Sequence, residues 1–159
     1  GGGGRVGASA AYALQLGAIG DEVVLVDVNA DAARGEALDL THGRAAGPGT
    51  RFTSGDYDAV AGSDLVIVTA GLRRRPDDSR LKLIERNAAL FGQILRSVQA
   101  VDLAPDAILL VVTNPVDVLT YLATAELGWP CSRTIGLGTM LDSLRSAPCL
   151  ASASASTRP

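Results

Sequence analysis

The chain has little positive charge, no long apolar run and few cysteines, and each shortage excludes a class of protein. Its net charge is −3 and its pI is near 5.0. This balance argues against a nucleic-acid-binding protein, which needs clustered positive charge. No apolar run approaches the roughly 18 residues that a membrane span requires. We therefore expect neither nucleic-acid nor membrane partners.

Other absences concern location and chemistry. The chain starts Gly1-Gly2-Gly3-Gly4, with no basic and apolar leader, so we expect no signal peptide. Cys131 and Cys149 form no CxxC pair, which favours unpaired thiols in a reducing cytoplasm. No G-K-[ST] is present, which excludes a P-loop NTPase. No tyrosine has a lysine four residues later, which removes the catalytic pair of short-chain dehydrogenases.

What the sequence does have is 47% hydrophobic residues and an alternation of helical and apolar stretches, typical of a parallel α/β sheet. Helices are expected where apolar residues recur at helical spacing, and strands where short apolar runs occur. The expected helices cover residues 6–19, about 30–42, about 84–98 and 117–126. The expected strands cover residues 23–26, 51–54, 65–68, 108–112 and 133–136.

A glycine pattern opens the first helix. Gly2, Gly4 and Gly7 match G-x-G-x-x-G, where the backbone turns tightly and approaches a pyrophosphate held at a helix N-terminus. Four leading glycines alone are weak evidence. Asp27 strengthens the interpretation, because it ends the next strand, where a carboxylate accepts hydrogen bonds from the ribose hydroxyls. That carboxylate would repel a 2′-phosphate, so the pattern predicts NAD rather than NADP.

Seven segments then carry a resemblance to a known family. They are V-G-A-S-A-A-Y-A-L, V-V-L-V-D-V-N, G-E-A-L-D-L-T-H-G, V-T-A-G, S-R-L-K-L-I-E-R-N, V-T-N-P-V-D-V-L-T-Y and I-G-L-G-T-M-L-D-S-L-R. In this order and spacing the chain resembles the lactate/malate dehydrogenase family from Gly2 to about Arg145. The resemblance implies a Rossmann-type doubly wound parallel sheet over residues 1–145, with NAD as cofactor and a 2-hydroxy or 2-oxo acid as substrate. It implies no metal.

The resemblance also implies roles for individual residues. Arg80 would polarise the reacting carbonyl and Arg145 would hold the substrate carboxylate as a bidentate fork. Asn114 would hydrogen-bond the substrate, and Asp142 would orient a histidine that acts as general acid and base. Taken singly, each could instead be a solvated, capping or turn residue. The implied cofactor contacts are Gly2, Gly4, Val6, Gly7, Asp27, Ala70, Gly71, Asn87, Val112 and Asn114.

The substrate signal is Arg74, six residues before Arg80. An arginine at this place in the family pairs with the second carboxylate of malate or oxaloacetate, whereas glutamine accompanies lactate. We therefore expect a malate-type enzyme. The alternatives are an L-lactate dehydrogenase, which T-N-P-V-D-V-L-T favours, and a non-catalytic NAD-binding module. NAD-dependent glycosidases would need metal-binding Cys and His residues that are not seen.

Both ends of the chain are unusual for this family. The first, central strand is missing before Gly2, and a C-terminal substrate domain with the family's catalytic histidine is absent. His42 ends a helix that runs away from the cofactor edge, so it cannot replace that histidine. We expect residues 146–159 to be an unstructured tail, either from a shifted reading frame near codon 146 or a genuine disordered end. We expect the polypeptide alone to be poorly stable and inactive, and the full-length protein to be a homo-oligomer.

Overall fold

Helices and strands alternate along the chain, as the apolar pattern predicts. The computed structural model describes residues 1–43, 49–140, 142–144 and 146–147. The expected tail lies outside them except for residues 146–147, and so does Arg145. The elements, in chain order, are α1 (Arg5–Leu16), β1 (Glu22–Leu25), α2 (Ala30–Gly43), β2 (Arg51–Ser54), η2 (Asp58–Val60), β3 (Leu65–Val68), α3 (Arg80–Gln99), β4 (Ile108–Val111), α4 (Val116–Leu127), η3 (Cys131–Arg133) and β5 (Thr134–Gly136).

The first helix is shorter than its sequence pattern predicts. The pattern extends it to residue 19, but α1 ends at Leu16 and Gly17 caps it by donating its N–H to the carbonyl of Ala13. Ala18 then takes a positive φ of 50°, which helical backbone does not allow. The chain therefore leaves the helix and turns toward β1, although Ile19 continues the apolar spacing.

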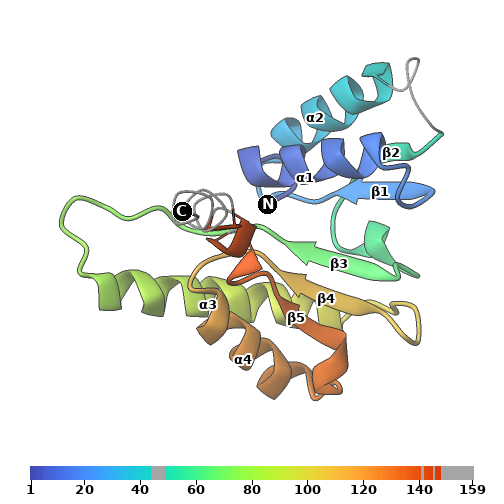
Figure 1. Cartoon of the computed structure of the whole chain (residues 1–159). Coiled ribbons are helices and arrows are strands. Elements are labelled where there is room, and N and C mark those ends of the chain that lie inside the picture. Colours follow the sequence, from blue (N-terminus) through green and yellow to red (C-terminus); the bar gives the residue numbers. More distant parts are fainter. Residues whose placement is uncertain (44–48, 141, 145, 148–159) are drawn as a thin grey trace, which may run out of the picture.

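All the strands are parallel, and they form two sheets rather than one (Figure 1). In the first, β1 pairs with β2 from Glu22↔Arg51 to Leu25↔Ser54. The other has the order β3-β4-β5, with Leu65 opposite Ile108. Within the described part of the chain no strand lies between β1 and β3. The family resemblance implies a central strand at this place.

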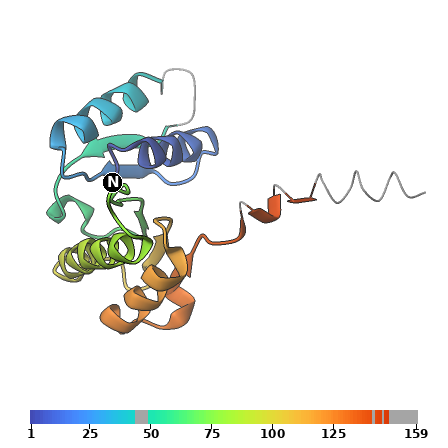
Figure 2. The same ribbon diagram turned by 90° about the vertical axis from the view of Figure 1, so that its left-hand side faces the viewer.

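Each sheet has its own core, and the two cores lie in different halves of the molecule (Figure 2). The larger core packs α3 and α4 around β4, where Phe91, Leu95, Leu109 and Leu119 are at most 1% exposed. The smaller core packs α1 and α2 on the first sheet, with Phe52 at 6% exposure. No helix in the described ranges is both long and apolar enough to cross a bilayer.

Candidate cofactor and substrate site

The carboxyl ends of β1, β3 and β4 meet at one edge of the molecule, and hydrogen bonds join the loops that follow them. The N–H of Gly2 donates to the carbonyl of Val26 at 2.9 Å. Thr69 Oγ1 donates to the carbonyl of Gly1 at 3.0 Å, and Thr113 Oγ1 donates to the carbonyl of Ala70 at 2.8 Å. The residues expected to bind cofactor therefore lie along one continuous edge, where parallel α/β sheets bind their ligands.

Two of the expected glycines are required by close packing of backbone. A Cβ on Gly7 would lie 2.3 Å from the carbonyl oxygen of Gly1, a distance that real Cβ atoms do not reach. A Cβ on Gly2 would lie 3.0 Å from the backbone nitrogen of Val26. These contacts allow the loop to lie flat between α1 and the end of β1. The glycine motif found in the sequence therefore forms a packed loop in which these positions require glycine.

The start of α1 supplies donors for a phosphate. Gly4 is the N-cap with an extended backbone, and no side chain caps the helix. The first-turn amides, among them that of Val6, have no acceptor inside the helix because their partners would precede it. Together with the positive end of the helix dipole, they form the type of anion site that the cofactor's pyrophosphate uses. Val6 itself is 55% exposed at this end.

Asp27 is held by backbone donors directly beside this loop. Its Oδ2 accepts from the N–H of Gly3 at 3.1 Å, and its Oδ1 accepts from the N–H of Asn29 at 3.0 Å. Burial alone would raise the pKa of Asp27. The hydrogen bonds from Asn29 and Gly3 and the positive charge of the chain's amino group outweigh burial, so the pKa lies below its ordinary value. The carboxylate is thus ionised and oriented, as recognition of ribose hydroxyls requires.

Two neighbours of Asp27 were not expected from the sequence. The Gly1 ammonium lies 3.5 Å from Oδ2 of Asp27. Tyr57 follows β2, and its phenol pKa is raised by burial and by the charge of Asp27. The only sequence signal for Tyr57 is its position three residues after a strand that ends at the same edge. It adds an aromatic, hydroxyl-bearing wall next to the carboxylate.

The loop after β3 is fastened to α3 by Asn87. This side chain is only 3% exposed. Its Oδ1 accepts from the N–H of Leu72 at 2.8 Å, and its Nδ2 donates to the carbonyl of Leu83 at 3.0 Å. A Cβ on Gly71 would lie 3.5 Å from Oδ1 of Asn87. Asn87 therefore lies against Gly71 and holds the loop after β3 in place, with its amide already engaged by the protein.

The arginine-rich loop is held by an acid that sequence reasoning did not single out as functional. Asp78 is 5% exposed, and its carboxylate accepts from the backbone N–H of Arg75 at 3.2 Å and from the guanidinium of Arg86. Burial raises the pKa of Asp78, but the hydrogen bonds from Arg75 and Arg86 and the positive charges of Arg86 and Lys82 lower it by more, so the pKa lies below its ordinary value. Arg74 Nε donates to the carbonyl of Asp78 at 3.1 Å.

The expected catalytic residues occupy exposed positions in the segments that follow β3, β4 and β5. Arg80 is the first residue of α3, behind the N-cap Ser79, whose Oγ accepts from the N–H of Lys82. Among the described residues no acid forms an ion pair with Arg80. Asn114 is exposed just after β4, and Val112 beside it is half-buried. Asp142 is exposed, and its carbonyl accepts from Ser146 Oγ at 2.8 Å.

His42 lies far from these groups, as expected. It is exposed in the last turn of α2, a helix of 14 residues that begins next to Asp27. A helix of that length spans about 21 Å, so His42 lies at the opposite end of the first sheet from the cofactor edge. The sequence holds no other histidine. His42 therefore lies too far from the expected site to serve as its general acid or base.

The geometry fits a dinucleotide. The glycines approach where Cβ atoms could not, the start of α1 faces the loop with unpaired donors, and Asp27 is an oriented carboxylate at the end of the next strand. Gly2, Gly4, Gly7 and Asp27 would hold NAD, whose nicotinamide, when bound, accepts or supplies a hydride. The fold and the site together define a Rossmann-type dinucleotide-binding domain.

Comparison with known proteins identifies the family. The sequence model described as lactate/malate dehydrogenase, NAD binding domain, matches residues 1–136. The chain therefore belongs to the lactate/malate dehydrogenase family, as the sequence resemblance indicates. It is 49% identical over 144 residues to L-lactate dehydrogenase 1 of Clostridium acetobutylicum and 48% identical over 143 residues to L-lactate dehydrogenase 1 of Bacillus cereus.

Two solved structures that resemble this chain are also lactate dehydrogenases. The minor L-lactate dehydrogenase from Enterococcus mundtii matches with a TM-score of 0.83 and 45% identity over 87% of this chain. A lactate dehydrogenase from a Medee basin deep-sea metagenome library matches with a TM-score of 0.83 and 41% identity. The match to the Clostridium acetobutylicum protein covers 91% of this chain but only 45% of that protein. The match to the Enterococcus mundtii structure covers 44% of that chain. It thus spans about half the length of these relatives.

Proposed function

We propose that this chain is the cofactor-binding part of an NAD-dependent 2-hydroxy-acid dehydrogenase that interconverts lactate and pyruvate. The observation that carries the proposal is the 49% identity to an L-lactate dehydrogenase over 91% of the chain. Several relatives named L-lactate dehydrogenase match at 47–49% identity over 89–91% of the chain. These relatives favour lactate as the substrate, whereas Arg74 in the sequence predicts malate.

A dicarboxylate substrate is the second candidate, and Arg74 is the observation that favours it. Its guanidinium is exposed in the loop before α3 and would neutralise a second carboxylate. However, its Nε is already bonded to the carbonyl of Asp78, so part of the group serves to hold the loop. This engagement and the names of the relatives make malate the less favoured substrate.

In the proposed reaction the residues of this chain bind and polarise. Arg80 would stabilise the negative charge that develops on the substrate oxygen, and Asn114 would donate to the same region. Arg145, outside the described residues, would bind the substrate carboxylate as a two-pronged donor. Asp142 would orient a histidine contributed by a part of the enzyme other than this sequence. The oxygen's proton would come from that histidine.

A chimaera tests the proposal. Residues 1–136 would replace the corresponding part of the Clostridium acetobutylicum enzyme, leaving everything before and after that part as it is there. We expect reduction of pyruvate by NADH with a kcat/KM at least about tenfold above that for oxaloacetate, a preference of about 1.4 kcal/mol. A preference for oxaloacetate would instead support the hypothesis that Arg74 binds the second carboxylate of a dicarboxylate substrate. A chimaera that binds NADH without turning over either acid would favour a non-catalytic binding module.

Three further expectations belong to this proposal. Residues 1–145 form the NAD-binding unit, and residues 146–159 do not belong to it. The full-length enzyme is a homo-oligomer. It works in the cytoplasm, in keeping with Cys131, which is a free and exposed thiol.

A further inference from the structure

The arginine loop, residues 72–79, is held at both of its ends by two neighbouring residues of α3. The loop arches outward between the end of β3 and the start of α3 (Figure 1). At its first end the N–H of Leu72 donates to Oδ1 of Asn87 at 2.8 Å. At its other end the carboxylate of Asp78 forms an ion pair with the guanidinium of Arg86. Because Arg86 and Asn87 are adjacent, a single turn of α3 holds the whole loop.

Asp78 also closes the last part of the loop on itself. Its N–H donates to the carbonyl of Arg75 at 3.1 Å, and its carboxylate accepts from the N–H of Arg75 at 3.2 Å. Its own carbonyl accepts from Nε of Arg74 at 3.1 Å. Residues 75–78 therefore form a closed turn, and the guanidinium of Arg74 is fastened to the backbone of that turn.

This turn depends on the charge of Arg86. The side chain of Asp78 is 5% exposed and that of Arg86 is 24% exposed, so solvent does little to stabilise either charge. Removing one partner of such a pair leaves the other charge uncompensated, which is strongly unfavourable. Without Arg86 the carboxylate of Asp78 would have to take up a proton or move toward solvent, and either change weakens its bond to the N–H of Arg75.

The orientation of Arg74 limits what it can bind. A guanidinium recognises a carboxylate best with two parallel N–H groups, from its two Nη atoms or from Nε and one Nη. Nε of Arg74 is already used by the carbonyl of Asp78, so one of these two edges is occupied. The same bond ties the side chain to the turn and restricts the directions in which the other edge can point.

We propose that Asp78 and Arg86 are positioning residues that set the substrate preference. Their ion pair keeps Arg74 on the 75–78 turn and away from a second substrate carboxylate, which favours monocarboxylic over dicarboxylic 2-oxo acids. Neither residue contacts substrate in this scheme, and both act through Arg74. The inference rests on the proposed function, because it concerns which acid that same site accepts.

The test compares two substrates in the chimaera. kcat/KM for pyruvate and for oxaloacetate is measured with Arg86 and with Arg86→Gln. We expect the ratio of oxaloacetate to pyruvate to rise at least about tenfold, because Arg74 is released. Arg86→Lys keeps the positive charge and one donor for Asp78, so it should restore most of the original ratio. A fall of both values by the same factor would show a merely structural role and would overturn the proposal.

Matched variants identify the route of the effect. In an Arg74→Ala background, Arg86→Gln should no longer change the ratio, since coupled residues are not additive. A change that persists without Arg74 would refute the proposal. Arg96→Gln, the same substitution at an exposed position in the last turn of α3, should leave the ratio unchanged. Asp78→Asn, which keeps the size of the side chain, is the second variant should Arg86→Gln not fold, and it should raise the ratio as well.

The two proposals fail separately. The ratio measured with the native residues tests the substrate, whereas the change of that ratio between variants tests the positioning role, whichever acid the chimaera prefers. In a chimaera that binds NADH without turnover, the dissociation constants of pyruvate and oxaloacetate from the NADH complex replace the rates. The same change in their ratio is expected there, and an unchanged ratio would equally exclude the positioning role.

Discussion

Asp27 accepts a hydrogen bond from the backbone of Gly3 at 3.1 Å, and this contact is one of those that join the end of β1 to the glycine loop. The two residues are 24 positions apart in the sequence. This hydrogen bond both orients the Asp27 carboxylate and holds the glycine loop in place, before any ligand is present. In the proposed cofactor site, recognition would therefore depend on a group that also has a structural role, and substitution can separate the two roles.

We predict that Asp27→Asn weakens NADH binding by about 10- to 100-fold, because charge-assisted hydrogen bonds to the ribose contribute about 1.5–3 kcal/mol. The variant keeps one acceptor for the backbone donors, so the far-UV circular dichroism should not change. Asp31→Asn, in the exposed first turn of α2, is the matched control and should bind NADH normally. Fluorescence titration of NADH measures both, and equal affinities would contradict the assigned role.

The free energy of unfolding should decrease as the pH falls below about 4. The pKa values of Asp27 and Asp78 lie below the ordinary 3.8 in the folded protein. Carboxylates with a depressed folded-state pKa stabilise the protein above their unfolded pKa, and this contribution is lost as the pH falls from about 4 through the folded pKa. Thermal melts between pH 6 and pH 2.5 should show the gap between the wild type and Asp78→Asn closing below about pH 4. A gap that does not change with pH would show that ionisation of Asp78 has no part in stability.

Two glycines, one in the glycine loop and one in α2, yield predictions of opposite sign. Gly7→Ala places a Cβ 2.3 Å from the Gly1 carbonyl, so backbone must shift and both stability and NADH affinity should fall. Gly35→Ala meets nothing within 4 Å in the middle of α2. It should stabilise the protein by about 0.4–1 kcal/mol and leave NADH binding unchanged. Urea denaturation and NADH titration of both variants measure the contrast, and a stable Gly7→Ala that binds normally would be inconsistent with the packing described.

Asp78 should control the order of the loop that carries Arg74. Asp78→Asn removes the charge that faces Arg86 and weakens the bond to Arg75, so residues 72–78 should exchange amide hydrogens faster. Asp77→Asn, the same change at an exposed neighbour, should leave exchange unchanged. Hydrogen exchange followed by mass spectrometry distinguishes the two, and equal protection would mean that Asp78 does not hold the loop.

Arg80 should affect turnover and not cofactor affinity. In the chimaera, Arg80→Gln should lower kcat for pyruvate by about 100- to 1000-fold, the usual cost of losing one donor to a developing oxyanion. NADH affinity should stay within about twofold, a difference of about 0.4 kcal/mol, since the side chain would contact substrate. Arg96→Gln, in the last turn of α3, should change neither quantity. A loss of NADH affinity that matches the loss of kcat would place Arg80 in the cofactor site instead.

Much of the fold could be predicted because its signals are local. The strand Leu65–Val68 is a short, wholly apolar run, and α3 carries apolar residues at helical spacing, as Phe91 and Leu95 show. The end of α1 was predicted wrongly because the positive φ of Ala18 leaves no mark in the hydrophobic pattern. Asp27 and the glycines could be found because each follows a strand or opens a helix at a regular spacing.

The roles of Asp78 and Tyr57 could not be found in this way. Asp78 is one of two adjacent acids in a polar loop, and only tertiary packing buries it against Arg86 while Asp77 stays exposed. Tyr57 becomes a neighbour of Asp27 because β1 and β2 are parallel and end at the same edge. Neither relationship has a sequence spacing that could have revealed it.

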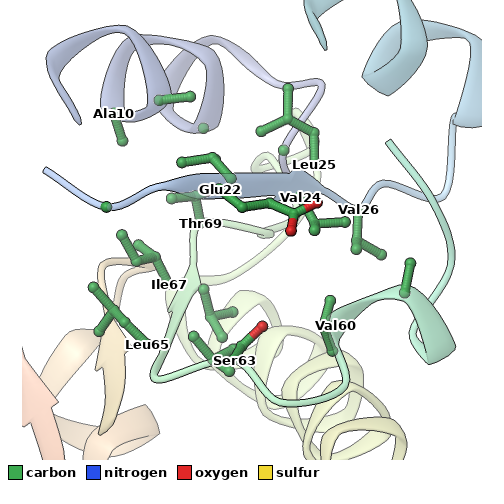
Figure 3. A pocket seen from close by; sticks show the side chains of 18 of the residues that line it. Ala10, Glu22, Val24, Leu25, Val26, Val60, Ser63, Leu65, Ile67 and Thr69 are labelled. Atoms are coloured by element: carbon green, nitrogen blue, oxygen red, sulfur yellow. The ribbon is translucent and has the colours of Figure 1, made fainter. Parts of the chain in front are cut away.

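The sequence by itself determined the type and order of the elements, the family and the NAD-binding edge. These could be predicted because they depend on local signals: the spacing of apolar residues, the glycine motif, and a carboxylate at the end of the following strand. Only the tertiary structure decided which acid holds the arginine loop and that Asn87 is engaged inside the protein. It also decided that β1 and β3, which belong to separate sheets, line the same pocket (Figure 3). These features depend on residues far apart in the chain, whose contacts arise from how helices and strands pack and not from their local patterns.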